Sequence, residues 1–219
     1  MNVQDYFIFG LIAYLLGSIP TAVWIGKAYY GLDVREHGSK NAGATNTFRV
    51  LGKKPGIIVL LIDILKGALA SSLPYFALSA MIALPDSGPN TEQLIRIGNV
   101  QIVASILAVV GHVFPLFAGF RGGKGVATSL GVIIGIQPLA ALICFGAFLS
   151  VFVVSKYVSL GAIVAAIVFP FVVHFMLKNE SLWMTIFSIV LSVLVIFAHR
   201  KNITRLWHGE ESRMNLFKK

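Results

Sequence analysis

The sequence predicts an all-α integral membrane protein with seven transmembrane helices, on three observations. Of its 219 residues, 57% are hydrophobic and 12% are charged, which is too apolar for a soluble protein. Several apolar runs approach or exceed the ~20 residues that a helix needs to cross the hydrocarbon. These runs are continuous rather than alternating, which favours a helical bundle over a β-barrel. We expect residues 1–219 to form one membrane-embedded domain.

Apolar runs follow one another along the chain at 6–25, 56–84, 97–120, 125–155, 157–177 and 181–198. The run 125–155 would make a helix of about 46 Å, longer than the bilayer core is thick, so it should be two helices. Proline disfavours helix at the preceding residue, which places the break at Gln137-Pro138. The first of the two helices reaches only about 18 Å, so it should be held within protein or start below the membrane surface. The amino terminus lacks the basic region of a signal peptide and should remain as the first span.

Basic residues gather on one side of this arrangement. The loops after the first, third, fifth and seventh spans share a side, which holds Lys27, Arg35, Lys40, Arg49, Lys53, Lys54, Arg121, Lys124, Lys156, Arg200, Lys201, Arg205, Arg213, Lys218 and Lys219. The other side has only Arg96 and Lys178. By the positive-inside rule, the amino terminus lies outside and the carboxyl terminus in the cytoplasm. Cytoplasmic loops facing anionic lipid explain the net charge of +9, so nucleic acid is not an expected partner.

Several kinds of site are excluded by what the chain lacks. The single cysteine, Cys144, lies in an apolar run, so neither an internal disulfide nor a cysteine-based metal site is available. The chain shows no HExxH zinc motif, no GxSxG elbow and no histidine followed five residues later by aspartate. We therefore expect no metal, no cofactor and no serine triad.

The first segment that indicates chemistry is the predicted cytoplasmic loop 37–49. Its small polar residues, glycines and one guanidinium suit an oxyanion, which arginine can grip with two hydrogen bonds. The candidates are Ser39, Asn41, Thr45, Asn46 and Arg49. A turn-rich loop in which Asn and Ser cap short helices is an equal alternative.

The second segment runs from His112 to a glycine-rich turn, Gly122-Gly123-Lys124-Gly125, that opens onto the short fourth helix. Exposed amides, a helix amino terminus and Lys124 together would make a phosphate cradle. The spacing is not that of a P-loop, so ATP is not implied. The alternative is that the glycines only permit tight packing. His112 is expected to help shape this segment.

The third segment begins the tail, at 199–206, and closes with Gly209 and Glu211. His199 and Asn202 are three residues apart and would share a face if the last helix continues, although a basic membrane anchor alone would explain the charges. Ser159 opens the sixth span, where a helix amino terminus and a hydroxyl could meet an anion or the serine could only cap the helix.

One pair of charges lies inside the second predicted span. Asp63 and Lys66 are one helical turn apart, and unpaired charge is expensive within a membrane. We expect a structural ion pair, with the positioning of Lys66 or Arg49 as the alternative.

Taken together, GSKNAGATN (38–46), GHVFP (111–115) with GGKGVAT (122–128), and HRKNITRL (199–206) resemble the bacterial acyl-phosphate:glycerol-3-phosphate acyltransferases, the PlsY-type enzymes. The resemblance covers residues 17–211. It implies transfer of a fatty acyl group from a long-chain acyl phosphate to the 1-hydroxyl of glycerol 3-phosphate, giving lysophosphatidate and phosphate. It also implies a multi-pass protein of the bacterial cytoplasmic membrane, surrounded by membrane lipids, active as a monomer and with its site at the cytoplasmic interface.

The resemblance also implies roles for residues. Contacts for glycerol 3-phosphate would be Ser39, Arg49, Lys124, His199 and Asn202, with Thr45 and Asn46 supporting or extending that site. Asn41 and His112 are further substrate-binding candidates. The Gly122–Gly125 turn and Ser159 would neighbour the acyl phosphate, and the tail would close over the site. The family is thought to use the acyl phosphate's own phosphate as proton acceptor, and the rival hypothesis is His199 as general base. A transporter of phosphate esters is the alternative function.

Overall fold

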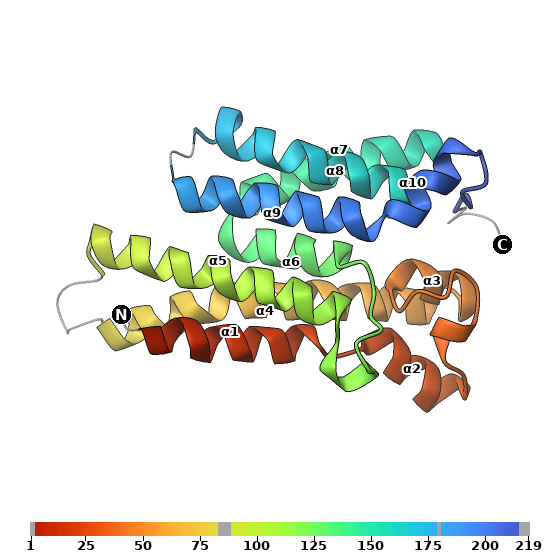
Figure 1. Ribbon diagram of the computed structural model, residues 1–219, viewed down its shortest axis with the longest axis horizontal. Coiled ribbons are helices and arrows are strands. Elements are labelled where there is room, and N and C mark those ends of the chain that lie inside the picture. The colour runs from red at the N-terminus through yellow and green to blue at the C-terminus, as the bar shows by residue number, and fades with distance from the viewer. Residues whose placement is uncertain (1–2, 83–88, 179–180, 215–219) are drawn as a thin grey trace. The chain divides into compact units, whose positions relative to one another are not determined.

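The computed structural model describes residues 3–82, 89–178 and 181–214, and every regular element within these ranges is a helix (Figure 1). The predicted all-helical class is confirmed. The chain divides into two compact units, residues 1–136 and 137–219. The expectation of one domain stays a prediction. Leu84, Lys218 and Lys219, used above to place a span and the basic side, lie outside the described residues.

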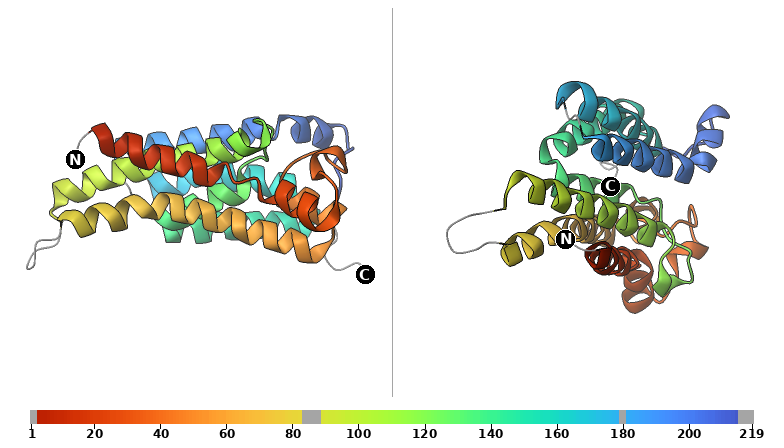
Figure 2. Two further views of the ribbon diagram at one scale, coloured as in Figure 1. Left: turned by 90° about the horizontal axis from the view of Figure 1, so that it is seen from below. Right: turned by 60° about the vertical axis from the view of Figure 1, so that its left-hand side comes forward.

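The first unit holds helices of very different length. In chain order they are α1 (Val3–Gly17), α2 (Thr21–Tyr30), the 3₁₀ turn η1 (Val34–Glu36), α3 (Ala44–Val50), α4 (Lys53–Ile82), α5 (Thr91–Val113), the 3₁₀ turn η2 (Leu116–Ala118) and α6 (Val126–Ile136). Helices α1 and α5 run side by side and both contact α4 (Figures 1 and 2). The short elements α2, η1, α3 and η2 gather at one end of these long helices.

Glycine allows the helices of this unit to approach at backbone distance. A Cβ at Gly17 of α1 would overlap the Ala108 carbonyl of α5, and one at Gly131 of α6 would overlap the Ile64 carbonyl of α4. Small residues serve this purpose in membrane helices, where packing replaces the hydrophobic effect between helices. The predicted short helix is therefore confirmed, and it packs closely along α4.

The second unit contains α7 (Pro138–Ser155), α8 (Val158–Phe171), the π-helical turn η3 (Val172–Met176), α9 (Leu182–Ala198) and α10 (Arg200–Trp207). Helix α6 ends at Ile136 and α7 begins at Pro138, which confirms the predicted break. Helices α9 and α10 meet at an angle of 59°. The last helix therefore bends at His199 instead of continuing straight, as the shared-face argument assumed.

Five described helical stretches are long and apolar enough to cross a membrane, at Val3–Tyr30, Lys53–Met81, Thr91–Ala118, Pro138–Ser155 and Val158–Met176. The bent pair α9 and α10 would make a sixth. Large apolar side chains are exposed along them, including Leu61, Phe76 and Leu142, as expected where hydrocarbon is the solvent. Seven spans stay a prediction because α6 is shorter than a bilayer-crossing helix.

Candidate active site

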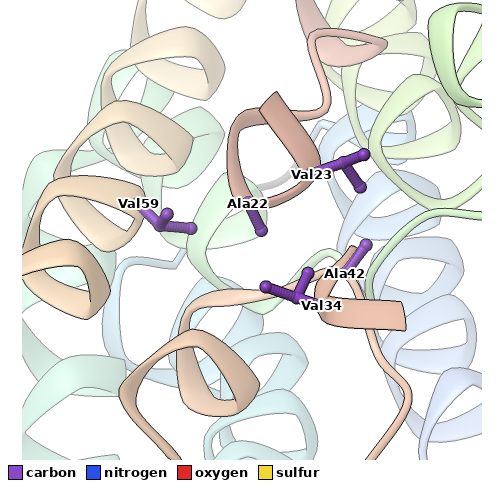
Figure 3. Packing of buried hydrophobic residues seen from close by; sticks show 5 residues of the cluster. All are labelled: Ala22, Val23, Val34, Ala42 and Val59. Carbon is purple, nitrogen blue, oxygen red and sulfur yellow. The ribbon is translucent and has the colours of Figure 1, made fainter. Parts of the chain in front are cut away.

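Loop 37–49 is attached to the first unit by a small apolar cluster. Val34 before the loop and Ala42 within it pack with Ala22 and Val23 of α2 and Val59 of α4 (Figure 3). Val34 and Val59 are completely buried. The cluster holds the polar loop to two helices without using any of its hydrogen-bonding groups.

Asn46 organises this loop from within α3. Its Nδ2 donates to the carbonyls of Val34 (2.7 Å) and His37 (3.1 Å), and its Oδ1 accepts from the amide (2.8 Å) and hydroxyl (3.0 Å) of Ser39. The residue is 0% exposed. Its side chain therefore stabilises the loop, in keeping with the supporting role implied by the resemblance. The helix-capping alternative is wrong here, because the N-cap of α3 is Gly43 and no side chain caps it.

The other candidates of this loop lie nearer the surface. Ser39, Asn41 and Thr45 are half-buried, and Arg49 is exposed on the last turn of α3. The Ser39 hydroxyl gives its hydrogen to Asn46, so toward a ligand it can act only as an acceptor while that bond is made. Arg49 and Lys40 are exposed cations of this loop, and Arg49 is the one among the predicted site residues.

Arg35 ties the first segment to the second. Its Nη1 donates to the carbonyls of Ala118 (2.7 Å) and Arg121 (3.3 Å), while its Nε (3.0 Å) and Nη2 (2.7 Å) bind the Asp33 carboxylate. Arg35 holds the pKa of Asp33 well below its usual range, and Asp33 raises that of Arg35. Sequence reasoning counted Arg35 only as a cytoplasmic charge. The two carbonyls that Arg35 binds are 83 and 86 residues away, so no spacing in the sequence indicates these contacts.

The glycine-rich turn is folded back on the end of α5. The Gly122 amide donates to Val113 (3.2 Å) and the Gly123 amide to His112 (3.1 Å). These two amides are thus used within the protein, so the expectation of exposed amides is wrong for them. A Cβ at Gly123 would overlap the His112 ring and lie 3.0 Å from the Ala42 carbonyl. Glycine is therefore needed for the two motif segments of this unit to meet.

Lys124 follows this turn and is half-buried. Gly125 then adopts a positive φ of 78°, which glycine tolerates, and α6 begins at the next residue. Since only Gly125 separates Lys124 from α6, Lys124 lies directly before a helix amino terminus, as predicted.

A buried polar network joins residues of α2, α4, α5 and α6. Lys66 Nζ is 2.8 Å from Asp63 Oδ1, and the two side chains are 4% and 2% exposed. Thr21 also donates to Asp63 (3.2 Å), and Lys66 donates to the Ile19 carbonyl (2.9 Å). The predicted ion pair is confirmed. His112 extends the network, because its Nδ1 lies 3.7 Å from Asp63 Oδ1 and 3.1 Å from the Thr128 hydroxyl.

The second unit brings two other candidates together. Ser159 lies in the first turn of α8 and donates to Glu211 Oε1 (2.8 Å), and Asn202 Nδ2 donates to the same oxygen (2.7 Å). Arg205 Nε is 3.4 Å from the other carboxylate oxygen. The capping alternative for Ser159 is wrong, since the N-cap is Tyr157 and no side chain caps α8. Sequence reasoning named Glu211 but assigned it no contact.

His199 lies at the bend between α9 and α10 and is 3% exposed. Its Nδ1 is 2.8 Å from the Val195 carbonyl, which can only accept a hydrogen. Nδ1 therefore carries a hydrogen. Asn202, one turn later, is also buried, and its backbone N–H donates to the His199 carbonyl (2.8 Å).

The tail beyond α10 folds back onto the start of α8. Gly209, at a φ of 72°, ends α10, with its amide bonded to Leu206 and that of Glu210 bonded to Arg205. Arg213 then donates to the Tyr157 hydroxyl (3.2 Å). The reversal brings Glu211 to Ser159. Among residues 3–82, 89–178 and 181–214, no group of three or more His, Cys, Asp or Glu could hold a metal ion.

Comparison with known proteins identifies the family. A sequence profile described as glycerol-3-phosphate acyltransferase matches residues 7–209. The chain belongs to the glycerol-3-phosphate acyltransferase family. Proteins of that name from Chlorobaculum tepidum (41% identical, 95% of this chain, 96% of the relative) and Listeria welshimeri (44%, 93% and 94%) are similar along nearly their whole length.

A solved structure of the integral membrane glycerol 3-phosphate acyltransferase PlsY (YgiH), in its glycerol 3-phosphate form, superposes with a TM-score of 0.83 at 36% identity. It covers 97% of this chain and 99% of its own. The lysophosphatidic acid form gives 0.79 at 35% identity, covering 96% and 95%. With the apolar helices above, this likeness makes the present protein a multi-pass membrane protein of the same family.

Proposed function

We propose that this acyltransferase moves a fatty acyl group from a long-chain acyl phosphate to the 1-hydroxyl of glycerol 3-phosphate, releasing lysophosphatidate and phosphate. The observation that carries the proposal is the solved relative, which is known in a glycerol 3-phosphate form and a lysophosphatidic acid form. This chain shares its fold over nearly the whole length. Those two ligands are the acceptor and product of one acylation. The donor is proposed from the motif resemblance.

The geometry of each unit suits this reaction. In the first unit, Arg49 and Lys124 are cations on a loop and a turn that Asn46, Arg35 and Gly123 hold in place. In the second, His199 and Asn202 are buried at the helix bend. We assign Ser39, Arg49, Lys124, His199 and Asn202 to glycerol 3-phosphate, and the Gly122–Gly125 turn with Ser159 to the acyl phosphate.

The reaction needs no covalent intermediate with the protein. Acyl phosphate is an activated mixed anhydride, so the site has to align the hydroxyl with the carbonyl and stabilise the negative charge that develops. The hydroxyl oxygen forms the new ester bond as the bond from carbonyl carbon to phosphate oxygen breaks. The hydroxyl proton passes to the departing phosphate, or to His199 Nε2 if that residue is the base.

We place the reaction at the cytoplasmic face of a bacterial cytoplasmic membrane, in a monomer with seven spans and an external amino terminus. The basic residues of the loops supply the argument for orientation. Acyl phosphate has a chain that belongs among helices and a head group that belongs at this interface, where Arg49 and Lys124 would meet it.

The decisive experiment measures phosphate release from palmitoyl phosphate by the purified protein, with and without glycerol 3-phosphate. We expect acceptor-dependent release with lysophosphatidate formed, and a loss of about a hundredfold in Lys124→Ala and Arg49→Ala, since each removes a charge-assisted contact to phosphate. Lys53→Ala, which removes an exposed cation from α4, is the matched control and should keep full activity.

Other outcomes would contradict the proposal. Turnover from acyl-CoA but not from acyl phosphate would overturn the donor. Accumulation of labelled glycerol 3-phosphate in vesicles without lipid formation would favour a transporter. Near-normal turnover by His199→Gln would remove the general-base hypothesis and leave the departing phosphate as the proton acceptor.

A further inference from the structure

Helix α9 carries an exposed apolar stripe along its whole length. The stripe consists of Leu182, Ile186, Ile189, Val193 and Phe197, which follow one another at helical spacings of three or four residues and are all exposed. With 17 residues, α9 is roughly 25 Å long, close to the thickness of the hydrocarbon core. The stripe is therefore the lipid-facing surface of this helix.

The stripe continues round the 59° bend onto α10 (Figure 1). The Arg200 guanidinium lies over the Phe197 ring, 4.6 Å from its centroid, and Nη1 donates to the Phe197 carbonyl (3.3 Å). Arg200, Ile203 and Trp207 are then spaced at i, i+3 and i+7, so they share one face of α10. Ile203 and Trp207 are 40% and 89% exposed. This apolar face is thus continuous with a surface that already meets lipid.

The other two faces of α10 have different environments. Asn202 is buried and donates to Glu211, and Leu206 is half-buried, so this face is turned toward the protein. Lys201 and His208, seven residues apart, are exposed on the remaining, polar face. A helix with an apolar face, a charged face and little overall hydrophobicity is typical of the boundary between hydrocarbon and water.

We infer that α10 lies in the head-group layer of the membrane, where Arg200 and Lys201 bind the phosphates of anionic lipids. Ile203 and Trp207 face the lipid, and tryptophan favours this layer because its ring is apolar and its N–H is polar. Long basic side chains can keep their stems on apolar surface while the charge reaches a phosphate.

The charge of α10 determines which lipid is preferred. Its eight residues include three cations and no acidic residue, which favours anionic over zwitterionic head groups. None of the residues on this lipid-facing surface is among those assigned above to the substrates. The inference therefore goes beyond the proposed function.

The test uses the full chain in lipid nanodiscs and the fluorescence of Trp207. Trp24→Phe and Trp183→Phe, both at exposed positions, leave Trp207 as the single tryptophan. Phosphatidylglycerol and phosphatidylcholine, each brominated near the glycerol backbone, are compared as quenchers. Both should quench Trp207, and phosphatidylglycerol should be preferred by about fivefold or more, the factor expected for one cation beside an anionic surface.

Two charge variants assign this preference to α10. Arg200→Gln combined with Lys201→Gln should reduce the preference to less than about twofold. Lys53→Gln combined with Lys54→Gln removes two adjacent exposed cations from the start of α4. This matched control should keep the preference, and loss of the preference in both variants would mean that it does not arise at α10.

Three other outcomes would also overturn the inference. Equal quenching by the two lipids would show that no anionic head group is selected. Quenching by dissolved acrylamide but not by brominated lipid would place Trp207 in water, and protection from both quenchers would mean that another polypeptide, such as a second copy of this chain, covers the face. The measurement does not depend on turnover, so an inactive protein with the expected quenching would contradict the proposed function alone.

Discussion

Asn46 and Arg49 are three residues apart in α3, yet their side chains have opposite environments. Asn46 is 0% exposed with four hydrogen bonds, whereas Arg49 is exposed. An asparagine suits the buried position because it supplies two donors and an acceptor on one short side chain. The arrangement makes Asn46 responsible for the loop on which Ser39 lies, and it leaves Arg49 available to an anion.

We therefore expect Asn46→Asp to damage both stability and acceptor binding. The substitution keeps the size but turns the donors facing the Val34 and His37 carbonyls into a repelling oxygen. Leaving such groups unsatisfied costs about 1–3 kcal/mol or more, which should lower the thermal midpoint in detergent and raise the KM for glycerol 3-phosphate. Asn90→Asp is the matched control, because this N-cap uses its side chain to accept from Gln93 and aspartate caps equally well. Equal midpoints for the two variants would contradict the role of Asn46.

The Asp33–Arg35 ion pair should make the stability of the protein depend on pH, in a direction that the lowered pKa of Asp33 determines. Its folded-state pKa is lowered, first by the hydrogen bond from Arg35, so its contribution to stability is fully present above the ordinary aspartate pKa and declines as pH falls below about 4 toward the folded value. The midpoint difference between the wild type and Asp33→Asn should be constant from pH 7 to 5 and shrink at pH 3. A difference that grows at low pH would contradict the clamp.

At the scale of elements, one short helix determines where the glycine-rich turn ends. Helix α6 has 11 residues and begins directly after Gly125. It lies against α4 at backbone distance through Gly67, Gly131 and Gly135, where a Cβ would overlap Thr128, Ile64 and Ser71 respectively. Because Lys124 precedes this helix, its position depends on how closely α6 packs.

Gly131→Ala should therefore reduce both stability and activity. The added methyl would overlap the Ile64 carbonyl, which α4 cannot move without breaking its own hydrogen bonds, and overpacking of this kind costs about 1–3 kcal/mol. We expect a lower thermal midpoint together with a higher KM for both substrates. Gly98→Ala in α5 is the control, since its Cβ would meet nothing within 4 Å. Lowered midpoints in both variants would point to a general effect of alanine instead of α6 packing.

For the whole molecule, the orientation in the membrane follows from the distribution of charge. The proposed topology places the start of α4 in the cytoplasm and the start of α5 outside. Lys53 and Glu92 are exposed at these two places, and the native Cys144 is buried. Lys53 and Glu92 can therefore each be replaced by cysteine, in a protein whose own Cys144 is replaced by alanine, with little effect on packing.

In spheroplasts, a membrane-impermeant maleimide should label Glu92→Cys and leave Lys53→Cys unlabelled until the membrane is permeabilised. The expectation rests on the preference of Lys and Arg for cytoplasmic loops. The reverse labelling pattern would mean that the protein has the opposite orientation, with the candidate site at the outer face. Labelling of both positions in sealed spheroplasts would require a different number of spans.

The sequence by itself determined those features that depend on local physics. Apolar run length predicted the membrane helices, the backbone geometry of proline predicted the break between Ile136 and Pro138, and the expense of unpaired charge in a membrane predicted the Asp63–Lys66 pair. The motifs also marked the segments that carry the candidate site, because phosphate chemistry restricts which residue types can serve it.

Only the tertiary structure decided which partners those residues have. Arg35 binds carbonyls 83 and 86 residues away, Ser159 donates to a carboxylate 52 residues away, and Gly123 lies against His112 with its amide already used. None of these contacts leaves a periodic or spacing signal, since each depends on how the chain returns to itself. Hydrogen bonds are short and directional, so only the path of the backbone decides which donor meets which acceptor.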